Sequence, residues 1–250
     1  MKVRTMPRLA IAVCAAVLGR PVAADEAAAG RAAKVLADTA TGKDEGARLF
    51  TLEKAPATGI PGLEEAARHS ATSSDRTERA LALALLARID VSRNRDLFVE
   101  ALRSPFRVVR LRALNGLLSL EDPALAPLFV SSLENDPDPD LRALAARGLG
   151  LAGLESGREA LRKALENGPP VVQRAAVEAL VASGDRSSGG RLLERARGAS
   201  GQERLRLFRL VGLVPDPALV QQLTPLLDDP GAETRAAAAV AILSILEASR

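Results

Sequence analysis

Residues 128–146 read LFVSSLENDPDPDLRALAA. An apolar segment ends in the polar turn around Asp136, and a second apolar segment then opens with Leu141 and Arg142. Asp138 stands directly before a proline, which is typical of a helix start, because the first backbone N–H groups of a helix have no partners within it. The stretch therefore predicts two short helices joined by a tight turn.

Arg142 belongs to a pattern that recurs along the chain. A basic or polar residue, here called the anchor, is followed by a small or apolar residue three positions later and an aliphatic residue seven positions later. Successive anchors are separated by 31, 32, 31, 31 and 31 residues. The anchors are Arg79, Arg110, Arg142, Gln173, Arg204 and Arg235. A fixed period in this range is typical of a solenoid, in which each unit buries its apolar face against its neighbours.

The first helix of each predicted pair has an apolar column of its own. Its members are Phe98, Phe129, Leu161, Leu192 and Leu223. Running the period backwards adds a weaker unit with Leu36 in its first helix and Arg48 as its anchor. No window shows the alternation expected of a half-buried strand. The expected fold class is therefore all-α, a right-handed α-solenoid of about seven stacked helix pairs with a period of 31 residues.

Acidic and hydroxyl side chains mark the places where helices should begin. An oxygen acceptor there can bond the free N–H groups of the first turn. The residues expected to precede first helices are Asp90, Asp122, Asp185 and Asp216. Those expected to precede second helices are Ser104, Asp138, Asp229 and the capping box from Ser200 to Glu203.

The N-terminal segment has the three-part organisation of a secretory signal peptide. Basic residues precede a ten-residue apolar run from Leu9 to Leu18, and a Gly-Arg-Pro segment and Val22-Ala23-Ala24 follow it. We therefore expect a signal peptide over residues 1–24, cleavage after Ala24, and a periplasmic or secreted protein. The run is too short to span a bilayer, so no membrane span is expected once it is removed. Cys14, the only cysteine, is interpreted as an ordinary residue of this run.

Removing this segment changes the charge balance. The whole chain holds 34 Lys and Arg against 31 Asp and Glu, a net charge of +3. Residues 1–24 contain four basic and no acidic residues, so residues 25–250 hold 30 basic against 31 acidic residues, a net charge of −1. A nearly neutral chain gives no electrostatic case for nucleic-acid binding, which normally requires a strongly basic surface.

The repeat pattern resembles HEAT repeats, in particular the short bacterial class related to phycobilin-lyase-type HEAT-like repeats. An Asp in the turn and a Val-Arg pair opening the second helix are typical of that class. The matching residues are Asp136 with Leu141-Arg142, Asp229 with Arg235, and Val109-Arg110 without the Asp. The resemblance covers residues 30–250 and implies a solenoid whose second helices line the concave surface. It implies little about function, because such repeats serve many unrelated partners.

Residues that could carry catalysis or bind a metal are scarce. His69 is the only histidine, and a metal site needs several convergent ligands. His69 is therefore interpreted as a surface residue near the end of a first helix. Ser-His-Asp catalysis would need His69 as well, and no Gly-x-Ser-x-Gly turn is present to carry the serine. We expect no catalytic residue, no metal site and no cofactor.

The arginines fall into two sets. The anchors lie close to the apolar side of their helices, so their guanidinium groups are expected to be partly buried and bonded to turn carboxylates or carbonyls. A second set points away from the packed side. On the concave surface these side chains could form a cationic strip for an acidic peptide, protein patch or polyanion; the alternative is a solvated face, interrupted by Glu178. The second set consists of Arg112, Arg147, Arg174, Arg206 and Arg209.

The last predicted helix is apolar from Ala236 to Leu246 except for Ser244. The end of a solenoid normally carries a polar cap, and this end has none. We expect a partner or a second copy of the chain, as a homodimer, to cover it; the alternative is a shallow alanine-rich surface that needs no cover. The residues expected at this interface are Val240, Leu243, Ile245 and Leu246.

These features together predict one solenoid domain over residues 25–250, acting as a non-catalytic protein-binding scaffold or adaptor of the cell envelope. Its partner would be another protein with an acidic segment, docked on the second helices or on the C-terminal end. The alternative is a lyase- or chaperone-like enzyme resembling bilin-lyase HEAT proteins, which the scarcity of His, Cys, Tyr and Trp disfavours. The export signal and the neutral charge both oppose a third class, the DNA-repair HEAT proteins.

Overall fold

The structure is a computed structural model that describes residues 22–151 and 157–249. This part of the chain forms 14 α-helices and contains no strand, so the predicted all-α fold class is confirmed. None of the described helices combines the length and the hydropathy that a membrane crossing requires. Most of the predicted signal peptide lies outside the described residues, and the cleavage site predicted after Ala24 falls within the first described helix, which begins at Val22. The signal peptide itself stays a prediction.

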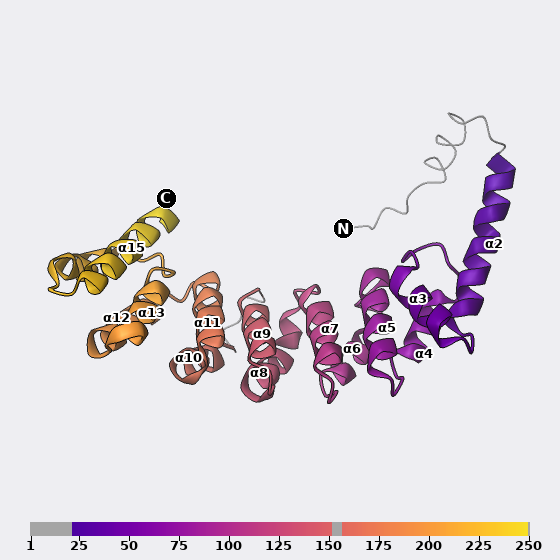
Figure 1. The fold of residues 1–250 in the computed structure, drawn as a ribbon, viewed down its shortest axis with the longest axis horizontal. Coiled ribbons are helices and arrows are strands. Elements are labelled where there is room, and N and C mark those ends of the chain that lie inside the picture. Colours follow the sequence, from indigo (N-terminus) through magenta and orange to yellow (C-terminus); the bar gives the residue numbers. More distant parts are fainter. Residues whose placement is uncertain (1–21, 152–156, 250) are drawn as a thin grey trace. The chain divides into compact units, whose positions relative to one another are not determined.

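The helices alternate between the two predicted layers (Figure 1). The first helices are α2 (Val22–Ala40), α4 (Leu63–Ser70), α6 (Arg95–Ala101), α8 (Ala126–Asn135), α10 (Arg158–Asn167), α12 (Ser188–Gly198) and α14 (Pro217–Leu223). The second helices are α3 (Glu45–Lys54), α5 (Arg76–Ile89), α7 (Arg107–Leu118), α9 (Pro139–Leu151), α11 (Pro170–Ala182), α13 (Gly201–Val211) and α15 (Ala232–Ala248). The short 3₁₀ helices η1 (Pro123–Leu125) and η3 (Thr224–Asp228) flank α8 and α14. The described helices thus form the seven pairs that the period predicts.

The contacts between residues group the chain into two compact units, one ending at Gly116 and the other beginning at Leu117. The boundary falls within α7. In the second unit, α9, α11 and α13 follow one another in one layer, with α8, α10 and α12 in the other (Figure 1). Each unit is described by itself below.

The core consists of the columns that the repeat pattern singles out. The residues three positions after the anchors are all buried, as are the members of the first-helix column from Phe98 to Leu223. In the seventh position after the anchors, five side chains from Leu86 to Val211 are fully buried, whereas Ile242 in α15 is half-buried. Ile242 is less buried because no described helix of the second unit packs beyond α15.

The anchor side chains form hydrogen bonds with the turn that joins the two helices of their own pair. Arg110 Nη1 donates to the carbonyls of Ser104 and Pro105, at 3.0 and 3.2 Å. Arg235 repeats this with Asp229 and Pro230, at 2.8 and 3.0 Å. Arg204 Nε donates to the Ala199 carbonyl at 2.7 Å, and the amide of Gln173 reaches the Glu166 carbonyl at 3.5 Å. The predicted bonds between anchors and turn carbonyls are therefore confirmed at these arginines.

Two anchors depart from this arrangement. The Nε atoms of Arg79 and Arg142 are buried without a hydrogen-bond partner among the described residues. Arg79 instead places Nη2 3.6 Å from the carboxylate of Glu100. A buried donor without a partner costs about 1–3 kcal/mol. The anchors Arg79 and Arg142 therefore stabilise their helix pairs less than the other anchors do.

The predicted helix starts are confirmed at most of the acidic residues. Asp90 is wrong as a helix start, because it is the C-cap of α5, and α6 begins only at Arg95, with Asn94 as its N-cap. Asp122, Asp185 and Asp216 each accept a hydrogen bond from the backbone N–H two residues later, at 2.9–3.0 Å. Asp138 accepts from the N–H groups of Asp140 and Leu141 at the start of α9. The capping box predicted at Ser200 is wrong, because the Ser200 side chain makes no cap hydrogen bond and Glu203 pairs with Arg206 instead.

Candidate interaction surfaces

Three of the five arginines predicted to line the second helices are exposed and unpaired. Within the described residues, Arg112 on α7, Arg147 on α9 and Arg209 on α13 make no ion pair or side-chain hydrogen bond. Arg147 and Arg209 both occupy the fifth position after an anchor, on the fourth and sixth of the seven helix pairs. Their charges are therefore available to an incoming ligand.

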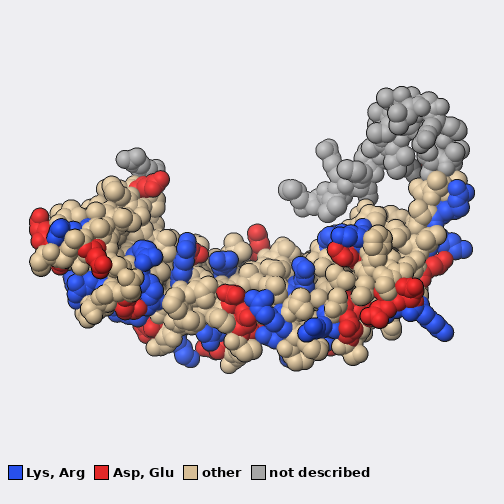
Figure 2. Space-filling model, viewed as in Figure 1, with Lys and Arg blue, Asp and Glu red and all other residues tan. Residues whose placement is uncertain are grey.

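The other two predicted arginines are neutralised within the chain. Arg174 Nε lies 2.9 Å from Glu178 Oε1, one helical turn away on α11. Arg206 is half-buried, donates from Nε to Glu203 Oε2 at 3.0 Å, and bonds the side-chain oxygen of Gln173 on the preceding second helix. Arg206 therefore faces the neighbouring repeat and not the open surface. Figure 2 shows blue and red side chains interspersed over the visible face of the second unit.

Exposed apolar side chains accompany the free cations on the second helices of the second unit. Leu151 lies one turn after Arg147 on α9 and is 61% exposed. Val171, at the start of α11, is also exposed. The surface thus offers two unpaired guanidinium groups beside apolar contacts, which suits a partner that combines carboxylates with apolar residues.

The C-terminal helix has an uncovered apolar stripe. Val240, Leu243 and Leu246 on α15 are 55%, 67% and 43% exposed. Ile245 was expected at this interface as well, but it is fully buried. Ile245 lies seven positions after the buried Ala238, on the inner side of the helix, so it belongs to the core and not to the exposed stripe.

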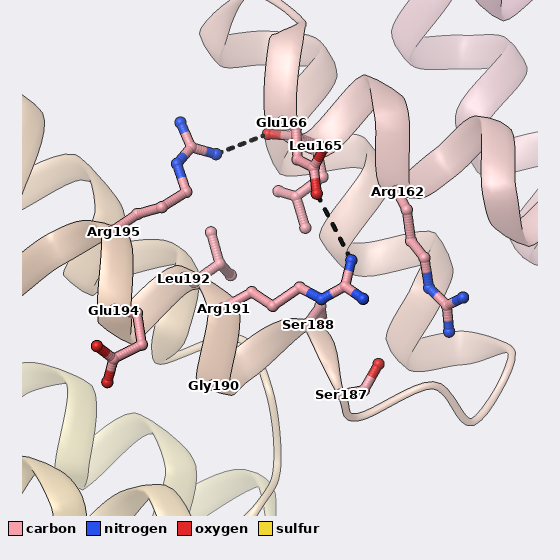
Figure 3. Close-up of a pocket in the computed structure, with 10 residues that line it drawn as sticks. All are labelled: Arg162, Leu165, Glu166, Ser187, Ser188, Gly190, Arg191, Leu192, Glu194 and Arg195. Carbon is pink, nitrogen blue, oxygen red and sulfur yellow. Dashed lines mark hydrogen bonds and ion pairs between the residues drawn. The ribbon is translucent and has the colours of Figure 1, made fainter.

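A cleft of about 600 Å³ separates α10 and α12 (Figure 3). Leu165 and Leu192 line its apolar part, and Arg191 and Arg195 extend over it from α12. Arg191 Nη1 lies 3.5 Å from Glu166 Oε1, and Arg195 Nη1 donates to the Leu165 carbonyl at 3.2 Å. The Arg191–Glu166 pair is solvent-exposed and therefore weak, so a ligand carboxylate could compete for Arg191.

One wall of this cleft is held by a buried carboxylate. Asp185 accepts two hydrogen bonds from Arg162, at 2.7 and 3.2 Å, and two more from the backbone N–H and the hydroxyl of Ser187. Burial acts to raise the pKa of Asp185, but the bonds from Ser187 and Arg162 outweigh it, so the pKa lies below its ordinary value. Asp185 thus stays ionised and ties the start of α12 to α10.

A second, more polar cleft of about 440 Å³ lies near the start of the chain and includes His69 and Glu78. His69 is in the last turn of α4 and is exposed, as expected. Burial acts to raise the pKa of Glu78, but hydrogen bonds from Ser70, Ser73 and Arg48 outweigh it and lower the pKa. A carboxylate held in this way is a poor general base at neutral pH. No group of three or more metal-ligating side chains occurs among the described residues.

Neither cleft was anticipated from the sequence. Arg162 and Asp185 are 23 residues apart and belong to different repeats, so no local motif joins them. The one residue of the cleft wall that the sequence singled out was Asp185, which was interpreted only as a helix start. A search for an arginine on the preceding first helix, α10, would have identified Arg162 as the partner of Asp185.

Comparison with known proteins agrees with this architecture. Residues 126–206 match the family of HEAT repeats. A chain of the complex of CpcE and CpcF of phycocyanin lyase from Nostoc superposes with a TM-score of 0.50 and 15% identity, covering 87% of this chain and 88% of that chain. At this identity the likeness concerns the fold alone. No curated protein sequence matches the chain.

Two further solved structures are similar over most of their length. An engineered protein aligns with a TM-score of 0.39 and 19% identity, covering 86% of this chain and 97% of that chain. Human deoxyhypusine hydroxylase in complex with glycerol aligns with a TM-score of 0.37 and 16% identity, covering 89% and 99%. Residues 126–206 thus match HEAT repeats, and the chain has the fold of a HEAT-like repeat solenoid.

Proposed function

We propose that the protein is a non-catalytic scaffold that binds another protein through its second helices. Stacked helix pairs present a long surface to a partner, and no single pair needs to form a closed pocket. The predicted signal peptide over residues 1–24 supports a site of action in the cell envelope, periplasmic or secreted. The proposed partner carries an acidic segment with apolar residues beside it.

The observation that carries this proposal is the exposed face of the second helices α9, α11 and α13, in which α11 and its Arg174–Glu178 pair lie between α9 and α13. Arg147 on α9 and Arg209 on α13 have no partner among the described residues, and Leu151 adds an apolar side chain that is largely exposed. Unpaired cations on a surface attract and orient an acidic partner, and an adjacent apolar contact adds affinity once the two surfaces meet.

Charge reversal on this face should remove binding. We expect the Arg147→Glu/Arg209→Glu variant to retain about one tenth or less of the partner that the unmodified chain captures from its own envelope fraction, because attraction is replaced by repulsion. The measurement is affinity capture of the tagged full chain, followed by identification and quantification of the bound protein. Binding should also weaken as salt is added.

The matched control is Arg186→Glu, which reverses an exposed arginine just before α12. This variant should capture as much partner as the unmodified chain. Equal capture by the Arg147→Glu/Arg209→Glu variant and the unmodified chain would contradict the proposed binding face.

The cleft between α10 and α12 favours a second candidate, a lyase- or chaperone-like enzyme that acts on a partner's prosthetic group. A volume of about 600 Å³ suits a small molecule, and Arg191 could pair with a carboxylate of a tetrapyrrole. Titration of the protein into a bilin or a porphyrin, followed by absorbance, tests this candidate. An unchanged chromophore spectrum in excess protein would eliminate it.

A further inference from the structure

The first turn of α12 departs from the pattern of the other first helices. Four positions before the residue of the apolar column, two other repeats have Leu125 and Leu219, and both leucines are buried. In α12 this position is Ser188, four positions before Leu192. A serine fills less space than a leucine, and the cleft of about 600 Å³ between α10 and α12 lies beside it.

The hydroxyl of Ser188 is buried and unpaired. Ser188 is 4% exposed and lines the cleft, and its Oγ has no hydrogen-bond partner among the described residues. A buried polar group without a partner is unfavourable and requires an explanation. Rotation about χ1 moves a serine hydroxyl between staggered positions. A ligand in the cleft that accepts a hydrogen bond from this hydroxyl would supply the missing partner.

The side of α12 that faces the cleft combines cations with an apolar wall. Four residues that line the cleft recur at intervals of three, one and three residues and so share one face of the helix. They are Ser188, Arg191, Leu192 and Arg195. Figure 3 shows the two arginines extending from this face toward α10, to which Leu165 belongs. The leucines and the aliphatic stems of the arginines form the apolar wall.

Arg191 is the cation of this cleft that is most open to an anion. Its pairing with Glu166 is long, at 3.5 Å, and both side chains are more than half exposed, so water screens the attraction. Arg162, by contrast, is held by two hydrogen bonds to Asp185. A carboxylate from a ligand can therefore take the place of Glu166 at Arg191.

The start of α12 also favours negative charge. Ser187, at the N-cap, makes no side-chain hydrogen bond to the first turn. The N–H groups of a first helical turn and the positive end of the helix dipole attract an anion. A Cβ placed on Gly190 would meet no atom within 4 Å, so a ligand can approach the backbone there. The nearby carboxylate of Glu194 repels an anion less than a free one would, because it pairs with Arg197 on the same helix.

We propose that this cleft binds a carboxylate joined to a short apolar group. The carboxylate accepts hydrogen bonds from the Ser188 hydroxyl and the Arg191 guanidinium, and the apolar group lies on Leu165 and Leu192. The site goes beyond the scaffold function, because it lies on first helices and the partner-binding face lies on second helices. Two sources carry this chemistry, a free aliphatic acid and the C-terminal residue of a protein chain.

Octanoate is the first probe, and 1-octanol is its neutral match. Isothermal titration calorimetry of the full chain should show that octanoate binds about tenfold more tightly than 1-octanol, because hydrogen bonds to a charged group are the stronger ones. Octanoate should also shift the backbone amide resonance of Gly190 in the ¹⁵N-labelled protein. Binding of 1-octanol as tight as that of octanoate would overturn the proposal.

Two variants locate the carboxylate. Arg191→Gln should weaken octanoate binding about tenfold, since it removes a charged hydrogen bond. Ser188→Ala should weaken it about threefold without lowering the melting temperature, because the hydroxyl has no partner among the described residues. The matched control is Arg186→Gln, which changes an exposed arginine outside the lining of the cleft and should bind octanoate as the unmodified chain does. Equal binding by Arg191→Gln and the unmodified chain would contradict the site.

A short peptide that ends in leucine, compared with the same peptide amidated at its C-terminus, distinguishes the two sources. Tighter binding of the free-acid peptide than of octanoate, lost on amidation, would assign the site to the C-terminal residue of a protein. The reverse order of affinities would assign it to a free aliphatic acid. Both outcomes support the site, and failure of both probes to bind up to about 10 mM would overturn it.

This test is separate from that of the partner-binding face. The Arg147→Glu/Arg209→Glu variant should bind octanoate as the unmodified chain does, because it changes second helices only. Octanoate binding without a captured partner would leave this site standing and remove the scaffold function, and capture without octanoate binding would do the reverse. An unchanged bilin or porphyrin spectrum would leave the site standing as well, since an aliphatic carboxylate is not a tetrapyrrole.

Discussion

Asp185→Ala is expected to lower the free energy of unfolding by about 3 kcal/mol at pH 7. The substitution removes the two hydrogen bonds from Ser187 in the turn before α12, worth about 1 kcal/mol, and the charged hydrogen bonds from Arg162, worth about 2 kcal/mol. Asp185 is buried, so water does not replace these bonds in the folded protein. Urea denaturation followed by circular dichroism measures the change.

Asp185→Asn removes the charge but can keep the hydrogen bond from the Ser187 N–H, and its loss of stability should depend on pH. Because folding lowers the pKa of Asp185, its charge contributes stability that is fully present above the unfolded pKa of about 3.9 and is lost as the pH falls through the lower folded pKa. The difference between the unmodified chain and Asp185→Asn should therefore be constant near neutral pH and shrink below about pH 4.

Asp216→Asn is the matched control for this effect. Asp216 occupies the same position one period later and accepts from the N–H of Ala218, but no ion pair joins it to an arginine in the described part of the chain. Asn caps a helix about as well as Asp does, so this variant should be nearly neutral. An equal cost for the two variants would show that Arg162 adds nothing to the stability.

Gly150→Ala is expected to destabilise the protein by about 2 kcal/mol, although alanine is the better helix former. The new methyl group would lie 2.7 Å from Cα and 2.9 Å from Cβ of Ala179. Both obstructing atoms belong to or adjoin the backbone of α11, so the overlap can be relieved only by moving the helices apart. Thermal or urea denaturation of the purified variant gives the value.

The control for Gly150→Ala is Gly190→Ala, on α12. A Cβ at Gly190 meets no atom within 4 Å. This substitution should therefore stabilise the protein by about 0.5–1 kcal/mol, as alanine for glycine does in an unobstructed helix. A destabilised Gly190→Ala, or a neutral Gly150→Ala, would contradict the packing described for α9 and α11.

The helix pairs were predictable because a repeat multiplies each weak signal. A single small residue three positions after an arginine means little, but six such positions at an almost constant interval identify a buried column. The acidic residues before the first helices added most of the boundaries: Asp122 and Asp216 are N-caps as expected, and Asp185 bonds the turn just before α12. The burial of Ile245 could also have been predicted, because Ile245 lies seven residues after Ala238 and therefore on the same side of the helix.

The surfaces were less predictable, because they depend on distances between helices that a period does not encode. No feature of the sequence singles out Gly148 and Gly150, whereas the structure packs each of them against a residue of a neighbouring second helix. Arg206 has the same wheel position as Arg112, yet it turns to Gln173 because a glutamine replaces the arginine anchor there. Predicting such a pairing requires knowing how two neighbouring repeats are placed relative to each other.

The closure of each helix pair by its own anchor has a consequence for how the gene can change. Arg110, Arg204 and Arg235 each bond a carbonyl five or six residues earlier in the same repeat. A duplicated segment of one full period therefore contains both the arginine and the carbonyl that it bonds, and a deleted segment removes both together. The one interval of 32 residues already holds an added residue, between Phe129 and Arg142, in the turn before α9. A solenoid of this kind can therefore lengthen or shorten by whole modules, while its two ends keep their character.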